Sequence, residues 1–581
     1  MNHVFKSFVL CIYLTISTIS TIVSADDPKF EHWPVDLKIN GTIIIAGPLS
    51  DFDLIKNTIA ASKRKQKTTI LTDDSTTQQT SVSLRSVFGD NKNVQTVKTD
   101  GTTKQLESIL RGSQFVLWHG IDPLSEALTK AATDCQSAFA KFIDDGKTLV
   151  VVGSPAEIVS EFYLPSAEGQ TKEATGLNLI PDCVVETEFS GSADDQNRLL
   201  NVLKNHPRCV GIGLAPNSLL VLSGRRARVA GKGTAKFLLA PNDRDPLRAQ
   251  TIRPGSAGRS RNLDSTLIDL MQWRRAAIDR TLDPFPAAKP NKPFVENGML
   301  MIVGGGGIPR GLMRQFIEAA GGKDHAKLVF IPCAESETVG KTQRMVISWK
   351  RAGVKHATYI HTKDRNQSNT DEKFHASLKD ATGIWFGGGR QWNFSDSYYG
   401  TKTHQLMKDV LKRGGVVGGS SAGASIQANY LARATPIGNS QIMAFGYERG
   451  GLGFISGVAI DQHFSQRRRH NDMTQLVNTH PQLLGIGIDE STAIIVQKSK
   501  AKVVGRGKVH FYDRTQPVVP GKPDFIALGQ GAEYDLAERE VLEKTEAEYD
   551  HNGDSSQSSA PKEKRRRGNN LFTTGKKTKS T

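Results

Sequence analysis

The same series of short segments occurs twice along this chain, and this internal repeat constrains the fold more than any other feature of the sequence. The first series lies between residues 40 and 233, and the second lies between residues 297 and 507. The matches keep the same order and a similar spacing. The paired segments are 40–47 with 297–304, 146–153 with 413–419, 176–180 with 451–455, 206–214 with 480–488, and 229–233 with 503–507. We therefore predict an internal duplication with two domains of one fold.

Each series alternates apolar runs rich in β-branched residues with segments of helical periodicity. This alternation is typical of an α/β domain built around a largely parallel sheet. We therefore predict two copies of such a domain, at residues 38–240 and 297–545. The connector between them, residues 241–296, is rich in Pro and Arg, and residues 263–280 within it have the periodicity of a helix.

The two ends of the chain differ in composition from the repeats. Residues 1–25 have Lys6 before an apolar stretch and small residues before Asp26, which is typical of a signal peptide. Export to a periplasmic or extracellular location is therefore expected, with an uncleaved anchor helix as the alternative. Residues 546–581 are polar and basic, add to the net charge of +16, and are expected to form a disordered tail. The tail is also compatible with contact to anionic surfaces, whereas no nucleic-acid partner is expected of an exported chain.

The cysteines do not indicate a metal site. A chain of 581 residues buries large cores without disulfide bonds, and no two of its cysteines have the spacing of metal ligands. We expect small core residues, and a bridge between Cys183 and Cys209 remains open. The sequence thus predicts neither a metal nor another cofactor.

Small residues surround Ser421 in the segment GGSSAGA (418–424), which follows an apolar run and precedes a helical pattern. A tight turn between strand and helix needs small residues, and it exposes the serine hydroxyl. Ser421 is therefore a candidate nucleophile, and the N–H of Ala422 is a candidate oxyanion donor. A second donor is expected from Gly388, in a glycine run that follows another apolar run. A glycine turn used for packing or for phosphate binding is the alternative.

A nucleophilic serine needs a base, and the base needs a partner that orients it. His463 follows an apolar run, and Asp489 with Glu490 follows the strand-like segment GIGI (485–488). Because α/β sheets place their sites at the carboxyl ends of the strands, we expect His463 near Ser421. Either acid is a candidate partner for the second ring nitrogen. The order serine, histidine, acid along the chain argues against the α/β-hydrolase fold.

Together, the segments GGSSAGA, DQHFSQRxR (461–469) and GIGIDE (485–490) resemble the cyanophycinase family of serine peptidases, which is related to the aspartyl dipeptidases. The resemblance covers about residues 297–513. It implies a class I glutamine-amidotransferase-like (flavodoxin-like) domain, with Ser421 as nucleophile, His463 as general base and Glu490 as the third member of a triad.

The resemblance also implies the substrate: a peptide with aspartyl or β-aspartyl linkages, such as the arginine-bearing polyaspartate cyanophycin. Two alternatives stay open, a dipeptidase for other Asp-X or isoaspartyl peptides and a non-catalytic exported binding protein. The peptide is the expected partner, and self-association into a homo-oligomer remains open.

A substrate pocket lined by Gln391, Asp461, Gln462, Arg467 and Arg469 is implied by the same resemblance. An exopeptidase must bind a free carboxylate, and a guanidinium group does so through two parallel hydrogen bonds. Asp461 is expected to meet a basic group of the substrate. A solvated basic surface is the alternative for the arginines.

Two positions depart from the family pattern within this expected pocket. Asp472 stands where relatives usually carry a third arginine, and Arg390 stands where an acid often precedes the glutamine. Neither position belongs to the triad, so we expect both changes to affect which substrate is bound and not the type of reaction.

The first copy lacks the candidate catalytic groups. Our alignment places Pro155, Glu188 and Pro216 opposite the three triad residues. Proline neither attacks a carbonyl carbon nor orients a base, so we predict that the first copy is a degenerate, non-catalytic domain.

Overall fold

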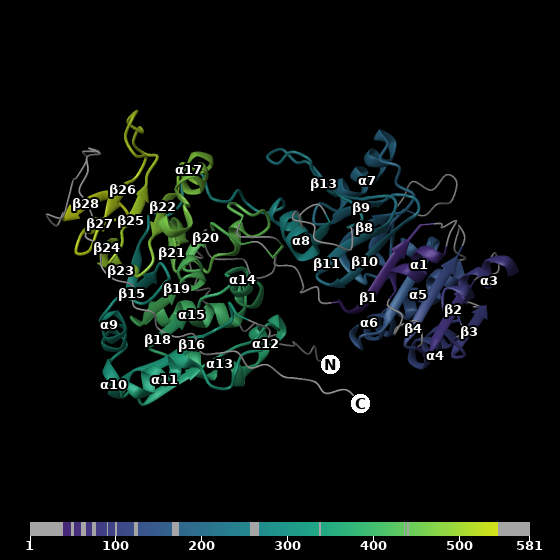
Figure 1. Ribbon diagram of the computed structural model, residues 1–581, viewed down its shortest axis with the longest axis horizontal. Helices are drawn as coiled ribbons and strands as arrows, with labels where there is room; N and C mark the ends of the chain where they lie inside the picture. Colours follow the sequence, from purple (N-terminus) through teal and green to yellow (C-terminus); the bar gives the residue numbers. More distant parts are fainter. Residues whose placement is uncertain are drawn as a thin grey trace, which may run out of the picture. The chain divides into compact units, whose positions relative to one another are not determined.

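The computed structural model describes residues 39–47, 52–59, 66–72, 77–89, 91–98, 102–120, 126–164, 173–255, 266–335, 338–434, 436–437 and 441–543. Within these ranges the chain has a mixed α/β architecture with four β-sheets, two in each half. Figure 1 shows the first half in purple and blue and the second half in teal to yellow. The α/β class predicted from the alternating segments is confirmed.

The larger sheet of the second half has the strand order β17-β16-β18-β19-β15-β23-β24-β27-β28. Strands β17 to β15 in this order are parallel to their neighbours, and the remaining neighbours are antiparallel. The strands are β15 (Val295–Val303), β16 (Lys327–Ile331), β17 (His356–Tyr359), β18 (Gly383–Phe386), β19 (Val416–Ser420), β23 (Thr492–Lys498), β24 (Lys500–Gly505), β27 (Glu533–Asp535) and β28 (Glu540–Glu543).

Side chains of β15 alternate between two cores, one on each face of this sheet. Leu300 and Ile302 enter one core, and Met301 and Val303 enter the other. A strand buried on both faces appears in the sequence as a continuous apolar run. The helices of the first face are α12 (Arg365–Thr370), α13 (Glu372–Lys379), α14 (Trp392–Tyr398), α15 (Lys402–Lys412) and α16 (Ala422–Ser425), and α9 (Leu312–Ala319), α10 (Gly322–His325) and α11 (Arg344–Arg351) belong to the second.

The smaller sheet of the second half has the order β20-β21-β22-β25-β26, and helix α17 (His470–Thr479) packs against it. Gly485 is required there, because a Cβ atom would lie 2.7 Å from Met473 Sδ and 2.9 Å from Val477 Cγ1 of α17. The strands are β20 (Ala428–Tyr430), β21 (Ile455–Gln462), β22 (Leu484–Ile488), β25 (Val509–Tyr512) and β26 (Ile526–Leu528).

The larger sheet of the first half has the order β14-β11-β10-β1-β5-β4-β2-β3, and the smaller has β13-β12-β9-β8-β6-β7. The strands are β1 (Ile39–Ala46), β2 (Thr68–Thr72), β3 (Val94–Lys98), β4 (Phe115–Gly120), β5 (Thr148–Gly153), β6 (Ser160–Tyr163), β7 (Ala174–Thr175), β8 (Ile180–Glu186), β9 (Val210–Leu214), β10 (Ser218–Gly224), β11 (Arg226–Gly231), β12 (Ala235–Leu239), β13 (Arg248–Ile252) and β14 (Leu267–Asp269). The helices are α1 (Asp53–Thr58), α3 (Gln78–Ser86), α4 (Thr103–Gly112), α5 (Glu126–Asp134), α6 (Gln136–Asp144) and α7 (Ala193–Asn205).

The two halves share a strand topology. The order from β3 to β11 matches that from β17 to β24, and the order from β6 to β13 matches that from β20 to β26. Each pair of neighbours has the same relative direction in both halves. The register agrees as well, because Ile43 pairs with Leu149 and the aligned Leu300 pairs with Val417.

The helix predicted at residues 263–280 of the connector is α8 (Leu270–Asp279). It begins later than predicted because residues 267–269 form strand β14, and Asp269 caps the helix by accepting a hydrogen bond from the N–H of Gln272 (2.9 Å). Helix α8 belongs to a core of the first half, and Phe445 from the second half packs against that core.

A buried network of charged groups, which we call the Asp396 network, joins the first half and α8 to helix α14 of the second half. Arg225 donates hydrogen bonds to Asp396, to Asp269 Oδ1 (2.7 Å) and to the hydroxyl of Tyr447 (2.5 Å). Arg275 of α8 also donates to Asp396, which accepts from Tyr447 (3.0 Å). Burial disfavours the charged carboxylate, but Arg225 and Arg275 hold the pKa of Asp396 below its ordinary value.

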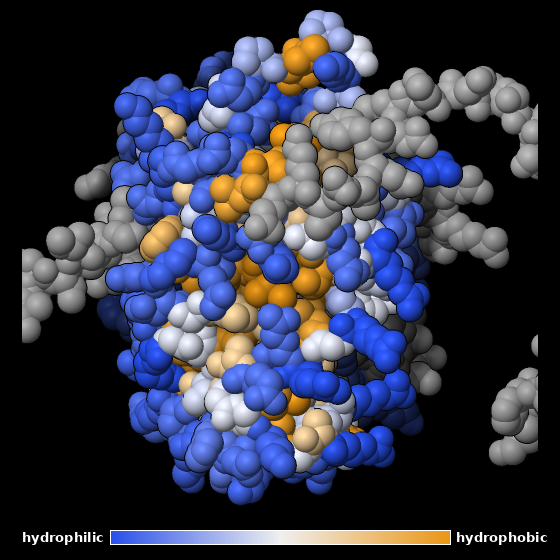
Figure 2. All heavy atoms as spheres, turned by 90° about the vertical axis from the view of Figure 1, so that its left-hand side faces the viewer, coloured by the Kyte–Doolittle hydropathy of each residue, from blue (hydrophilic) through white to orange (hydrophobic). Residues whose placement is uncertain are grey.

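Several sequence predictions fall outside the described residues, namely the signal peptide (1–25) and the basic tail (546–581). No helix among the described residues is long and apolar enough to cross a membrane. Cys183 and Cys209 are buried and not bonded to one another, as expected of core residues. Figure 2 shows the face on the side of β27 and β28, where apolar residues are visible among polar ones.

Candidate active site

Ser421 lies in a tight turn between β19 and α16, as the small residues around it predicted. Its backbone is left-handed, with a φ of 59°. Two glycines permit the turn: a Cβ atom on Gly419 would lie 2.2 Å from Gly423 O, and one on Gly423 would lie 2.3 Å from Phe386 O. The turn presents Ser421 at the carboxyl edge of the parallel strands.

The structure brings the three candidate triad residues into one chain of hydrogen bonds. Ser421 Oγ lies 2.9 Å from His463 Nε2, and His463 Nδ1 lies 2.5 Å from Glu490 Oε1. Asp489, the other acid left open by the sequence, instead accepts hydrogen bonds from the N–H groups of Ser465 and Lys508. In this arrangement, Ser421, His463 and Glu490 have the geometry of a nucleophile, a base and an orienting acid.

The loop after β15 holds the backbones around all three of these residues. Val303 O accepts a hydrogen bond from Ser421 N (3.0 Å), Gly304 O from His463 N (2.7 Å), and Gly305 O from Ser491 N (2.8 Å). This supporting role was missed at the sequence level, although the run of four glycines at residues 304–307 signalled it.

The glycines of this loop also make room for the triad side chains. A Cβ atom on Gly305 would lie 2.3 Å from His463 Cε1, and one on Gly306 would lie 2.5 Å from Glu490 Cβ. Any larger residue would therefore displace the imidazole or the carboxylate.

Both candidate oxyanion donors lie beside the serine. Ala422 is the next residue and is fully buried. The Gly388 backbone approaches so closely that a Cβ atom on it would lie 3.5 Å from Ser421 Cβ and 3.9 Å from Ser421 Oγ. The location fits the predicted oxyanion hole, and the donor role stays a prediction.

The predicted substrate-pocket residues lie around this site, but they differ in exposure. Gln391, Asp461, Gln462 and Arg469 are buried, and only Arg467 is exposed. Asp461 and Gln462 end β21 directly before His463. Arg467 is therefore the predicted pocket residue that lies open to solvent.

Asp461 is already occupied by groups of the chain itself. Its Oδ1 accepts from Arg469 Nη1 (2.6 Å) and from the N–H of Gln462 (3.0 Å), and its Oδ2 accepts from Arg433 Nε (2.8 Å). Direct contact between Asp461 and a basic group of the substrate, expected from the sequence, is not what the structure presents. Asp461 orients Arg469 instead.

Arg433 contacts the predicted pocket residues, and the sequence did not reveal this. It follows β20 in a loop, has no motif around it, and is 4% exposed. Its guanidinium contacts both Asp461 and Asp472, and its carbonyl oxygen accepts a hydrogen bond from Gln391 Nε2 (2.5 Å). The acid at position 472, which departs from the family pattern, thus has a partner from another element.

The first half keeps the backbone of this site without its chemistry. The β1–β5 and β15–β19 registers align Gly153 (φ 75°) with Ser421. The predicted alignment with Pro155 was wrong by two residues: proline has φ fixed near −65° and cannot adopt this left-handed backbone.

The other two alignments of the first half agree with its structure. Glu188 has the left-handed backbone of His463, with φ values of 58° and 50°. Pro216 follows β9 by two residues, as Glu490 follows β22. The described part of the first half therefore has no serine, base and acid at the triad positions.

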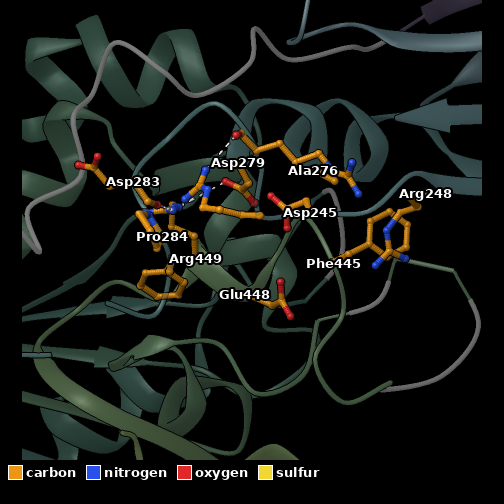
Figure 3. A pocket seen from close by; sticks show the side chains of 13 residues that line it. Asp245, Arg248, Ala276, Asp279, Asp283, Pro284, Phe445, Glu448 and Arg449 are labelled. Atoms are coloured by element: carbon orange, nitrogen blue, oxygen red, sulfur yellow. Dashed lines mark hydrogen bonds and ion pairs between the residues drawn. The ribbon is translucent and has the colours of Figure 1, made fainter. Parts of the chain in front are cut away.

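A cavity of about 220 Å³ lies elsewhere, between α8 and the segment 445–449 (Figure 3). No triad or predicted pocket residue lines it. Burial raises the pKa of Asp279 to about 6 and that of Glu448 to about 7. Figure 3 shows Arg449 beside Asp279, and Arg248 covers the ring of Phe445. This α8 cavity is a feature of the contact between the halves and not part of the triad site.

Within the part of the chain that the structure describes, no three His, Cys, Asp or Glu side chains are grouped to hold a metal ion.

Comparison with known proteins gives a family and several similar proteins. The model of peptidase family S51 matches residues 300–504. A cyanophycinase from Geminocystis herdmanii is 30% identical over 226 residues, or 38% of this chain and 82% of that protein. One from Synechococcus elongatus is 30% identical over 223 residues, or 37% of this chain and 68% of that protein. A crystal structure of a peptidase from an acI-B1 actinobacterium covers 42% of this chain and 98% of its own, with 22% identity and a TM-score of 0.31.

These sequence matches define a serine peptidase, which confirms the predicted enzyme class. The chain belongs to peptidase family S51, the family of the matching cyanophycinases.

The surroundings of His463 predict the pH dependence of hydrolysis. Burial lowers the pKa of His463 below its ordinary 6.5; the cations Arg467 and Arg469 act in the same direction, and Glu490 acts against them. A base must be unprotonated, so activity falls as the pH falls through this pKa. We expect the acid limb of a kcat/KM profile to have its midpoint below pH 6.5.

The variant Arg467→Ala is the control for this profile, because it removes a cation that lowers the pKa of His463. Its acid limb should move to higher pH. A wild-type midpoint above 6.5, or a midpoint unmoved in the variant at low salt, would contradict His463 as the base.

Proposed function

We propose that this chain is an exopeptidase that hydrolyses aspartyl or β-aspartyl peptides through Ser421, His463 and Glu490. The observation that carries the proposal is the chain of hydrogen bonds from Ser421 Oγ through His463 to Glu490. The names of the matching cyanophycinases favour a polyaspartate-type substrate.

The proposed reaction follows from this geometry. His463 Nε2 takes the proton of Ser421 Oγ while the oxygen attacks the scissile carbonyl carbon. The N–H groups of Ala422 and Gly388 are the proposed donors that stabilise the resulting oxyanion. His463 then gives the proton to the leaving amine, and water hydrolyses the acyl-enzyme by the same route. Glu490 holds the imidazole in the required tautomer and stabilises its charged form.

The experiment that tests this function is product analysis after incubation with cyanophycin and a panel of α- and β-aspartyl dipeptides. We expect hydrolysis of the bond that joins aspartate to the next residue, with release of that residue. Cleavage of the dipeptides alone would favour the second candidate, a dipeptidase for other Asp-X or isoaspartyl peptides. A chain that cleaves nothing and resists serine-reactive probes would be a binding protein.

We also propose that the two halves arose by internal duplication and that the first is non-catalytic. The shared strand order and register support this proposal, as do Gly153, Glu188 and Pro216 at the triad positions. A serine-reactive probe should accordingly label one residue, in the second half.

The two arginines after His463 should respond differently to substitution. Arg467 is exposed, so Arg467→Ala should leave folding intact and weaken carboxylate binding by about 1.5–3 kcal/mol, mainly through KM. Arg469 is 5% exposed and donates to Asp461 and to Gln462 O (2.8 Å), so Arg469→Ala should also lower the free energy of unfolding.

The measurements are steady-state kinetics on the best peptide and denaturant unfolding of each variant. Arg314→Ala, at an exposed arginine on α9, is the matched control and should change neither quantity. Wild-type kinetics in both Arg467→Ala and Arg469→Ala would show that the arginines do not bind substrate.

A further inference from the structure

The guanidinium group of Arg433 lies between Asp461 and Asp472, which form the acidic end of the proposed substrate pocket. We infer that Arg433 is a specificity-determining residue: it disfavours basic side chains at this end of the pocket, so that aspartyl peptides with a neutral or acidic neighbouring residue are cleaved faster than those with a basic one. The inference rests on the proposed function and narrows its substrate class.

The contacts of Arg433 leave no carboxylate of this cluster unpaired. Arg433 Nε donates to Asp461 Oδ2 (2.8 Å), and Nη2 donates to Asp472 Oδ2 (2.5 Å). The Arg433 side chain is 5% exposed, that of Asp461 is 1% exposed, and that of Asp472 is 43% exposed. A basic group of the substrate would have to displace Arg433 or approach it as a like charge, and both are unfavourable.

Arg433 is close to the reacting groups through two independent connections. Asp461, its first partner, lies two residues before His463 on β21. Its carbonyl oxygen binds Gln391, which follows the glycine run that packs against Ser421. A side chain held at both points lies near the triad and is not a distant surface group.

In the first half, the acid that aligns with Asp461 is also paired with an arginine, but this arginine lies on a helix. Glu186 aligns with Asp461 in the strand register, and it accepts hydrogen bonds from Arg198 of α7. Gly211 packs against Leu199 and Leu203 as Gly485 packs against Met473 and Val477, which aligns Arg198 with Asp472. In the second half this guanidinium comes instead from the loop, and the helix carries an acid.

The position of this arginine on the loop affects which substrates the pocket favours. A loop arginine held between two carboxylates fills space and offsets one of their two negative charges, and Arg469 offsets the other. The described cluster then presents two bound cations, Arg433 and Arg469, against the two acids, with Arg467 left exposed for the substrate carboxylate. Such a pocket favours an anionic or neutral ligand over a cationic one.

The test compares β-Asp-Arg with β-Asp-Leu as substrates of the wild type and of Arg433→Ala. Wild-type kcat/KM should be higher for β-Asp-Leu. In Arg433→Ala the ratio should move toward β-Asp-Arg by about 10- to 100-fold, because the substrate guanidinium then meets Asp461 and Asp472. Ethylguanidinium should increase cleavage of β-Asp-Leu by this variant, by filling the vacated space, and should not affect the wild type.

Arg539→Ala is the matched control, because Arg539 is a partly buried arginine (13% exposed) paired with Asp513 (2.6 Å) in the same half. It should keep the wild-type ratio. If circular dichroism shows that Arg433→Ala is unfolded, the double variant Arg433→Ala/Asp472→Arg returns the guanidinium to the helix, as in the first half. That variant should disfavour β-Asp-Arg as the wild type does.

A ratio unchanged in a folded Arg433→Ala, or a wild type that prefers β-Asp-Arg, would overturn the inference. If the wild type cleaves no peptide, the proposed function fails, and calorimetry decides the inference separately. Ethylguanidinium should bind to Arg433→Ala and not to the wild type, and equal titrations would overturn the role of Arg433.

Discussion

Ser421→Ala is expected to abolish peptide hydrolysis while the protein stays folded. Loss of the nucleophile from such a triad typically lowers kcat by about 10⁶-fold, because the base and the oxyanion donors then have no group to activate. The fold should survive because the turn is held through the backbone, by Ser421 N bound to Val303 O (3.0 Å). The measurement is kcat of the purified variant on the best peptide of the panel, with circular dichroism as the check of folding.

Ser420→Ala is the matched control for this result. It removes a hydroxyl one residue away, at the end of β19, and should leave turnover within a few-fold of the wild type. Ser421→Gly, which suits the left-handed backbone better than alanine does, should be as inactive as Ser421→Ala. Near-normal turnover in either Ser421 variant would refute the assignment of the nucleophile.

Asp396→Ala is expected to cause a large loss of stability. Asp396 receives hydrogen bonds from Arg225 and Arg275, and Arg275 is 1% exposed. Removing the carboxylate leaves two guanidinium groups without their shared counter-ion, and breaking a buried ion pair typically costs about 3–5 kcal/mol. Denaturant unfolding measures this loss.

The control for that experiment is an exposed ion pair of the same half. Asp380→Ala removes the partner of Lys327, where both side chains are about half exposed (59% and 45%), and it should cost less than about 1 kcal/mol. Asp396→Asn, which keeps the shape and loses the charge, should be intermediate. Equal stability of Asp396→Ala and Asp380→Ala would show that the Asp396 network does not stabilise the contact between the halves.

The sequence predicted those parts of the site that depend on short, local sequence patterns. Ser421, His463 and Glu490 each follow an apolar run, and parallel strands end at one edge of a sheet, so their meeting was predictable. Arg433 was not, because its function depends on Asp461 and Asp472, two residues from other elements that no periodicity connects to it.

The fold, too, was predictable where it depends on local sequence patterns and not where it depends on pairing between distant segments. Continuous apolar runs predicted the parallel strands around β15. The antiparallel extension through β24, β27 and β28 was missed because short strands with polar residues, such as Glu533–Asp535, have no distinct apolar pattern. The error at Pro155 arose from matching small residues along the chain, whereas the register of paired strands decides which residue occupies the turn.

The left-handed residues of the first half show that the backbone geometry of the site does not depend on the triad side chains. Gly153, Glu188 and Asn217 keep the backbone of Ser421, His463 and Ser491, although no chemistry uses it in the first half. The junctions that follow these strands therefore adopt this geometry with or without a triad. A residue placed at position 153 or 188 of the first half would already have the left-handed φ that Ser421 or His463 has in the second.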